Sequence, residues 1–186
     1  MKHRLGFDLI LLGDPASGKD TQALLLSKKY NVRLARSGEY LRKYYAKHYI
    51  QGGVAPTKLI LPFLRDSLKD IFGKNVIFVG AARLEREAKF LVRLLTKAGR
   101  DFFVLYIQLA KPEVIKRSKL RAARPEDTSV ELINKRLQYF KTEVKKTVQY
   151  YKKLRKIKFI KGENSVNNIH KEIISKLNDY KKRQTT

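Results

Sequence analysis

The fold of this chain is decided by one stretch, Gly13-Asp14-Pro15-Ala16-Ser17-Gly18-Lys19-Asp20-Thr21-Gln22. It follows the apolar run of residues 7–12 and leads into an amphipathic stretch over residues 21–30, which predicts the order strand, loop, helix. The two glycines let the loop backbone turn its N–H groups inward, the following helix adds the positive end of its dipole, and Lys19 adds a mobile cation. Together these features predict a loop that binds a chain of phosphates.

The loop departs from the common phosphate-binding pattern at Asp20, where a Ser or Thr usually contacts magnesium. A glycine–lysine pattern also occurs in ordinary turns, so a turn without a ligand is the alternative. The apolar strand before the loop and the helix after it favour phosphate binding, because they place the loop amides at the N-terminus of a helix.

The composition suits a single globular domain. The chain has 186 residues, which is within the size range of one domain with a sizeable core. It has no cysteine, so neither a disulfide nor a thiolate metal site is available, and a reducing compartment is predicted. No apolar segment of the sequence approaches the roughly 18 residues that indicate a membrane span. We therefore expect a cytoplasmic monomer with no membrane association.

The net charge of +25 must be explained by any function assigned to the sequence. Such a charge attracts polyanions, so nucleic acid is one candidate partner. The basic residues are spread over nearly every predicted helix, which favours a solvated lysine-rich surface over a dedicated nucleic-acid site. One denser block contains Lys141, Lys145, Lys146, Lys152, Lys153, Arg155, Lys156, Lys158 and Lys161.

Four further short apolar runs resemble the first predicted strand. They cover residues 32–35, 76–80, 102–109 and 157–160, and helical patterns separate them. Alternation of strand and helix, without a hairpin signal between runs, predicts an α/β fold with a doubly wound five-stranded parallel sheet flanked by helices. Ligands of such a sheet are expected beyond the carboxyl ends of its strands.

The predicted helices carry start signals. Ser37 precedes a helix over residues 38–50, Pro56 opens one that extends to about residue 72, and Ser165 precedes one over residues 166–180. Residues 84–98 and 111–123 also have helical spacing. The longest pattern, residues 130–154, predicts either one bent helix or two.

Four landmarks follow the loop in order along the chain. They are Ser37-Gly38-Glu39-Tyr40-Leu41-Arg42, then Gly80-Ala81-Ala82-Arg83, then Arg117 and Arg121 on one predicted helix, and finally Lys135-Arg136-Leu137. With the loop, they resemble the adenylate kinases and their nucleoside monophosphate kinase relatives, whose motifs read GxPGxGKGTQ, TGDxLR, DGFPR, a pair of arginines and KRL. The resemblance extends from the first strand to the last helix, and five landmarks in family order are far more specific than any one.

The resemblance implies a kinase that moves the terminal phosphoryl group of MgATP to a nucleoside monophosphate, with AMP the expected acceptor. Several cations suit a reaction that brings many negative charges together. The catalytic positions implied are Lys19, Arg83, Arg121 and Arg136. The positions implied for ATP are Gly13, Pro15, Ser17, Gly18, Lys19, Asp20, Thr21, Arg117, which would lie against the donor base, and Arg121. The positions implied for the monophosphate are Ser37, Gly38, Arg42, Val54, Gly80, Arg83 and Glu87.

Two inserts in one kinase domain of residues 1–186 are implied by the same resemblance. Residues from about 37 to 66 would bind the acceptor, and residues from about 121 to 129 would form a short lid. This lid has no cysteine and no room for a zinc-binding form, so structural zinc is not expected. Arg124 and Asp127 stand near the positions of the lid's arginine and aspartate.

Departures from the family pattern bear on the metal and on the acceptor. The aspartate of DGFPR is Val79 here, so one acceptor for magnesium-bound water is absent from the sequence. Asp20 and Glu39 are candidate replacements because magnesium prefers oxygen ligands, and a helix cap is the alternative role for Asp20. Glu87 stands where the family has an adenine-reading glutamine. A carboxylate there favours bases that present N–H donors, such as guanine or cytosine, unless it simply faces solvent.

Two functions from other classes remain open. The changes at Asp20 and Val79 are compatible with a nucleotide-binding module that has lost turnover. The basic surface is compatible with an RNA-binding protein that uses its nucleotide site as a switch. Formation of ADP tests the first alternative, and salt-dependent retention of RNA tests the second.

Overall fold

A computed structural model describes residues 3–45, 55–120 and 129–184 of the chain. The predicted site positions Val54 and Arg121, and the lid positions Arg124 and Asp127, lie outside these described residues.

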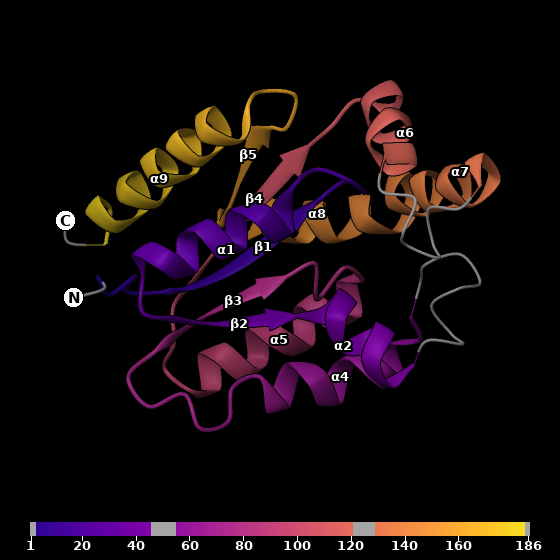
Figure 1. Cartoon of the computed structure of the whole chain (residues 1–186). Helices are drawn as coiled ribbons and strands as arrows, with labels where there is room; N and C mark the ends of the chain where they lie inside the picture. The colour runs from indigo at the N-terminus through magenta and orange to yellow at the C-terminus, as the bar shows by residue number, and fades with distance from the viewer. Residues whose placement is uncertain (1–2, 46–54, 121–128, 185–186) are drawn as a thin grey trace.

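The core of the structure is a five-stranded sheet in which every pair of neighbouring strands is parallel (Figure 1). The strand order is β2-β3-β1-β4-β5, so the chain goes from β1 to the edge strand β2, returns to β3 beside β1, and then continues outward through β4 and β5 on the other side. The register places Leu9 opposite both Ile77 and Phe103. The strands are β1 (Asp8–Gly13), β2 (Val32–Arg36), β3 (Asn75–Val79), β4 (Phe102–Gln108) and β5 (Ile157–Lys161). The predicted doubly wound parallel sheet is therefore confirmed.

Helices cover both faces of the sheet, because the central strand is apolar on both sides. Leu9 and Leu11 pack with α1 (Lys19–Lys29) and α9 (Val166–Lys182), which lie in front of the sheet in Figure 1. Ile10 and Leu12 belong to the opposite core, with α4 (Thr57–Asp66), α5 (Glu85–Lys97) and α8 (Lys145–Lys153). The remaining helical segments are α2 (Ser37–Tyr44), α6 (Lys111–Leu120), α7 (Val130–Tyr139) and the π-helical η2 (Phe140–Val144).

One helix prediction needs correction. The helix that follows Pro56 ends at Asp66 rather than near Phe72, because Asp70 has a φ of 51° and the chain turns there. Residues 130–154, predicted as one bent helix or two, are helical without a break up to Lys153, because the π-helical η2 joins α7 to α8. This segment brings Phe140 and Val144 into the core.

The carboxyl ends of the strands define the edge where the site lies. β1 ends at Gly13, β3 ends just before Gly80, and a hydrogen bond from the Gly80 amide to the Leu11 carbonyl (2.9 Å) holds these two ends together.

No helix among the described residues is long and apolar enough to cross a membrane.

Candidate active site

The loop after β1 needs glycine at two of its positions. A Cβ atom at Gly13 would lie 2.7 Å from both the Ile107 carbonyl oxygen and the Ser17 Oγ, so only glycine fits this position. Gly18 has a left-handed φ of 83° and is the N-cap of α1, which begins at Lys19. Asp20 lies in the first turn of α1, where a carboxylate is favoured by the helix dipole, but the N-cap position itself belongs to Gly18.

The rear of this loop is attached to β4 through Asp14. The Asp14 carboxylate accepts hydrogen bonds from the Tyr106 hydroxyl (2.7 Å) and from the Leu109 amide (2.8 Å). Burial raises the pKa of Asp14, although these two hydrogen bonds and the charge of Lys19 oppose the rise. The attachment fixes the loop relative to the strand that precedes α6.

A donor-side pocket opens between the loop and two more distant segments. One wall is the stretch from Ala16 to Gln22, which includes Lys19 and Asp20. The opposite wall includes Arg117 from α6 and residues 163–166 before α9. The Arg117 guanidinium is held by Glu113 (2.6 Å) and by the Gly162 carbonyl (2.9 Å), which fixes it across the pocket from the loop. The structure thus brings Arg117 together with the loop, as the resemblance implies for the donor base.

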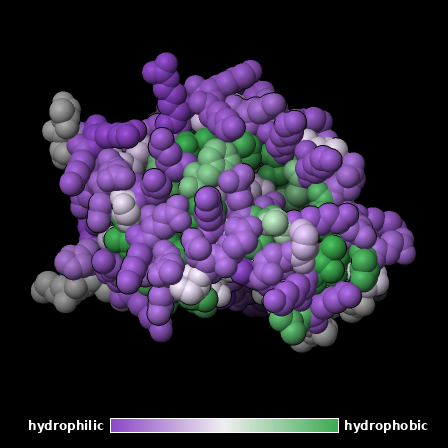
Figure 2. Space-filling view, turned by 90° about the horizontal axis from the view of Figure 1, so that it is seen from above, coloured by the Kyte–Doolittle hydropathy of each residue, from purple (hydrophilic) through white to green (hydrophobic). Residues whose placement is uncertain are grey.

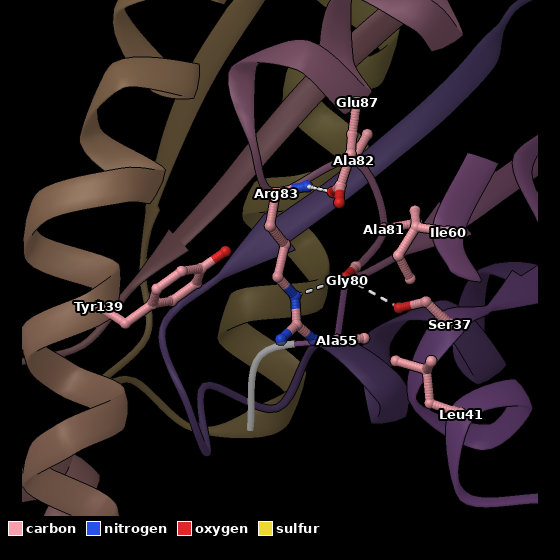
Figure 3. A pocket seen from close by; sticks show the side chains of 10 residues that line it. All are labelled: Ser37, Leu41, Ala55, Ile60, Gly80, Ala81, Ala82, Arg83, Glu87 and Tyr139. Atoms are coloured by element: carbon pink, nitrogen blue, oxygen red, sulfur yellow. Dashed lines mark hydrogen bonds between the residues drawn. The ribbon is translucent and has the colours of Figure 1, made fainter. Parts of the chain in front are cut away.

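A second cavity, on the acceptor side, lies between α2, α4, α7 and the segment after β3 (Figure 3). Its lining residues are Ser37, Leu41, Ala55, Ile60, Gly80, Ala81, Ala82, Arg83, Glu87 and Tyr139. The Gly80 carbonyl accepts a hydrogen bond from Ser37 Oγ (2.9 Å) and one from Arg83 Nε (2.5 Å). The prediction that Ser37 caps α2 is wrong, because α2 begins at Ser37 itself and the hydroxyl is used by Gly80 instead.

Lys19 and Arg83 meet at Gly80. A Cβ atom built on Gly80 would lie 2.9 Å from Nη2 of Arg83 and 3.2 Å from Cε of Lys19. Gly80 also has a left-handed φ of 63°, which L side chains rarely adopt. Lys19 lines the donor-side pocket and Arg83 lines the acceptor cavity, so one lining side chain from each cavity approaches this glycine.

Glu87 is built into the wall of the acceptor cavity. Its side chain is buried, and its carboxylate accepts hydrogen bonds from the Thr57 hydroxyl (3.1 Å) and from the amides of Arg83 (3.1 Å) and Leu84 (3.2 Å). Burial raises the pKa of Glu87, and the bonds from Leu84 and Thr57 and the charge of Arg83 oppose the rise. The alternative that Glu87 faces solvent is therefore wrong, and its bonds tie α4 to the start of α5.

The two candidate metal ligands lie in different places. Asp20 lines the donor-side pocket next to Lys19, where phosphates are expected. Glu39 is exposed, forms an ion pair with Arg36, and lines a separate groove along the outer side of α2. Val79 is buried in β3. The described residues contain no group of three or more His, Cys, Asp or Glu side chains that could hold a metal ion.

The remaining predicted positions are less central. Gly38 and Arg42 lie in α2, and neither belongs to the lining of the acceptor cavity described above. Arg136 lies in α7 and is 7% exposed. Pro15 is buried within the phosphate-binding loop, and Thr21 is exposed at the mouth of the donor-side pocket.

Two residues that bear on the acceptor cavity were not predicted from the sequence: Tyr139, which lines it, and Thr57, which donates a hydrogen bond to Glu87 in its wall. Burial raises the pKa of Tyr139 to about 12, with Glu87 adding to the rise, so the phenol stays a hydrogen-bond donor at neutral pH. Its spacing of three residues from Arg136 on one helix was a usable signal, because such residues share a helix face. Thr57 had no comparable signal, since its bond to Glu87 joins residues far apart in the sequence.

Comparison with known proteins agrees with this geometry. Residues 12–134 match the family model described as an AAA domain. An adenylate kinase from Parabacteroides distasonis is 32% identical, over 94% of this chain and 99% of the relative. Adenylate kinases from Azobacteroides pseudotrichonymphae and Thermus thermophilus are 30% and 28% identical, each over 91% of this chain and 96% of the relative. On this similarity over nearly its whole length, the chain belongs to the adenylate kinase family.

Proposed function

We propose that the protein transfers the terminal phosphoryl group of ATP to AMP, giving two molecules of ADP. Its membership of the adenylate kinase family makes it a phosphotransferase. The observation that carries the proposal is the junction at Gly80, where Lys19 of the donor-side loop and Arg83 of the acceptor cavity lie against the same residue. Two phosphate chains entering from these two cavities would meet end to end, as in-line transfer requires.

Charge neutralisation and positioning supply the catalysis in this proposal. Lys19 follows the transferring group, while Arg83 holds the acceptor phosphate, and the N-terminus of α1 adds its dipole. Arg136 and Arg121 are proposed to surround the transferring group, with Arg42 assisting at the acceptor. No general base is needed, because phosphoryl transfer of this kind depends mainly on electrostatics and alignment.

The donor end of the site has room for a magnesium–nucleotide complex. Bound Mg²⁺ supplies charge neutralisation on the phosphate oxygens. Asp20 is the carboxylate placed beside Lys19 in the donor-side pocket, so we assign it the contact to the metal or to its water shell. Glu39 is not included in the proposal because it lines a different groove and is paired with Arg36.

The identity of the acceptor base rests on Glu87 and its surroundings. Both carboxylate oxygens already accept hydrogen bonds, and among the described residues Thr57 alone donates to one of them, Oε1. An exocyclic amine of the base can donate to the remaining lone pair of Oε1, and adenine carries such an amine. The exocyclic amines of guanine and cytosine can do the same, so AMP is proposed on the strength of the adenylate kinase relatives, and GMP and CMP are the competitors to compare.

An acceptor screen tests the proposal. ADP formation is measured with ATP and each of AMP, GMP, CMP and UMP, for the native chain and for Lys19→Ala. We expect the highest kcat/KM with AMP and a loss of several orders of magnitude in Lys19→Ala, since one preorganised charge contact contributes about 3 kcal/mol or more to the transition state. An inactive native chain that still binds ATP would favour the nucleotide-binding module instead, and turnover with no acceptor at all would contradict transfer to a monophosphate.

The domain arrangement completes the proposal. The acceptor-binding insert of residues 37–66 is supported by α2 and α4, which lie between β2 and β3 and line the acceptor cavity. The short lid of residues 121–129, a monomeric state and a cytoplasmic location stay predictions. Size-exclusion chromatography with light scattering tests the oligomeric state.

A further inference from the structure

We propose that a groove behind the phosphate-binding loop binds single-stranded RNA. One wall of this RNA groove includes Tyr106 and Gln108 of β4 and Phe159 of β5, and the helical stretch α7–η2–α8 forms its other wall. It shares no lining residue with the donor-side pocket or the acceptor cavity. Its position therefore leaves both nucleotide sites free when it is occupied.

The floor of the RNA groove is aromatic. Tyr106, Phe140 and Phe159 line it, but Tyr106 and Phe140 are buried, so Phe159 is the ring left partly open to a base, 6.0 Å from the ring of Tyr106. Phe159 is half-buried on the edge strand β5, so part of its ring faces the groove. Aromatic faces of this kind stack unpaired bases without strong sequence preference. Double-stranded nucleic acid keeps its bases stacked on each other and cannot use such a floor.

The rim of the RNA groove is basic. Four exposed lysines surround the floor: Lys111, Lys135, Lys141 and Lys145. Only Lys135 has an ion pair within the described chain, with Glu131 (2.7 Å). Among the described residues that line the groove, Asp14 is the sole carboxylate, and Tyr106 and Leu109 already donate to it. The groove thus complements phosphates placed around stacked bases.

The surface of the molecule is strongly hydrophilic. Figure 2 looks down on the side that carries α9, β5 and α6, and it shows some hydrophobic side chains exposed among many long hydrophilic ones. The net charge of +25 adds a long-range attraction for any polyanion. A patch for another protein would more often have fewer lysines at its centre, since lysine is depleted from such interfaces.

Three amide side chains favour RNA over DNA. Gln108, Asn134 and Gln138 line the groove, and the last two are one helical turn apart on α7. An amide both donates and accepts hydrogen bonds, so it suits a ribose 2′-hydroxyl, which does the same. The chemistry of the groove therefore matches a short single strand of RNA.

The test is a fluorescence-anisotropy titration of a short labelled oligoribonucleotide at several salt concentrations. Lys141→Gln/Lys145→Gln removes two rim charges, and the matched control Lys171→Gln/Lys181→Gln removes two exposed charges from α9. We expect the groove variant to lower the slope of log affinity against log salt by about 1.4, because each phosphate contact to a single strand contributes about 0.7. The control is expected to leave the slope unchanged. Equal slopes for the two variants would show diffuse charge binding and overturn the proposal.

Further measurements separate the groove from the nucleotide sites and RNA from DNA. Phe159→Leu keeps an apolar side chain but removes the ring, and it is expected to weaken RNA binding about tenfold through lost stacking. Saturating ADP is expected to leave RNA bound, and its displacement by ADP would place the RNA in the nucleotide sites. The same sequence as DNA is expected to bind more weakly, and equal affinity would refute the assignment to RNA. ADP formation in each variant verifies that the fold is intact, and the exposed lysine variants keep the test valid if Phe159→Leu fails to fold.

Discussion

The substitution Gly80→Ala, compared with a matched control, should separate the effect of Gly80 on catalysis from its effect on the stability of the fold. The added Cβ would lie 2.9 Å from Nη2 of Arg83 and 3.2 Å from Cε of Lys19, so both cations have to move by a few tenths of an ångström. A misplacement of 1 Å in a reacting geometry can cost about 100-fold in rate, so we expect kcat to fall by about tenfold to a hundredfold. The left-handed φ of 63° adds a backbone cost of about 1–2 kcal/mol to the free energy of folding.

Gly99→Ala is the matched control for this experiment. Gly99 has nearly the same φ, 62°, but nothing lies within 4 Å of a Cβ built on it. Urea unfolding should therefore show similar losses of stability in the two variants, while a coupled ADP-formation assay should show a loss of kcat in Gly80→Ala alone. Full activity in Gly80→Ala, or equal losses of activity in both variants, would refute the junction of the two cavities at Gly80.

Three further predictions concern the metal and the stability of the fold. Asp20→Gly is expected to raise severalfold the magnesium concentration that gives half-maximal rate, and an unchanged magnesium titration would remove Asp20 from the metal site. Arg100→Leu should lower the free energy of unfolding by about 3–5 kcal/mol in urea titrations, because it leaves the buried Asp8 carboxylate without the guanidinium that now contacts it at 2.7 Å. Burial tends to raise the pKa of Asp101, but hydrogen bonds, above all the one from Lys156 (2.6 Å), lower it overall. The ionised Asp101 therefore stabilises the fold at pH values above the pKa of the unfolded state, and this contribution is lost as the pH falls through the pKa of the folded state. Asp101→Asn should therefore cost about 1 kcal/mol at neutral pH, and urea titrations should show that the difference from the native chain starts to shrink only as the pH falls below about 4, towards the lowered folded pKa.

The sheet was predictable because its signals are local. Near-continuous apolar runs such as residues 7–12 indicate strands that are buried on both faces, and β1 is indeed buried throughout. The loop from Gly13 to Lys19 was predictable for the same reason, since its glycines and lysine are adjacent in the sequence. Helix ends were less predictable. Helix α4 ends at Asp66, but the sequence after it contains no Gly or Pro before Gly73 to indicate the turn.

The side-chain partners in the site could not be read from the sequence. Serine is a residue type that favours helix N-caps, yet the hydroxyl of Ser37 donates to the carbonyl of Gly80, 43 residues away in the sequence. Glu87 looked like a free reader of the acceptor base, yet it is hydrogen-bonded to Thr57 from another helix. Such choices depend on which segments the sheet order brings together, and local patterns contain no information on that order.

Transfer of label from ATP to AMP is the most direct test of the central claim that the two cavities form one phosphoryl-transfer site. The native protein is incubated with ATP labelled in its terminal phosphate, with and without AMP, and the products are separated. The account predicts that the label appears in ADP, that two ADP form for each ATP consumed, and that no ATP is consumed without AMP. Release of labelled inorganic phosphate at the same rate with and without AMP would contradict it.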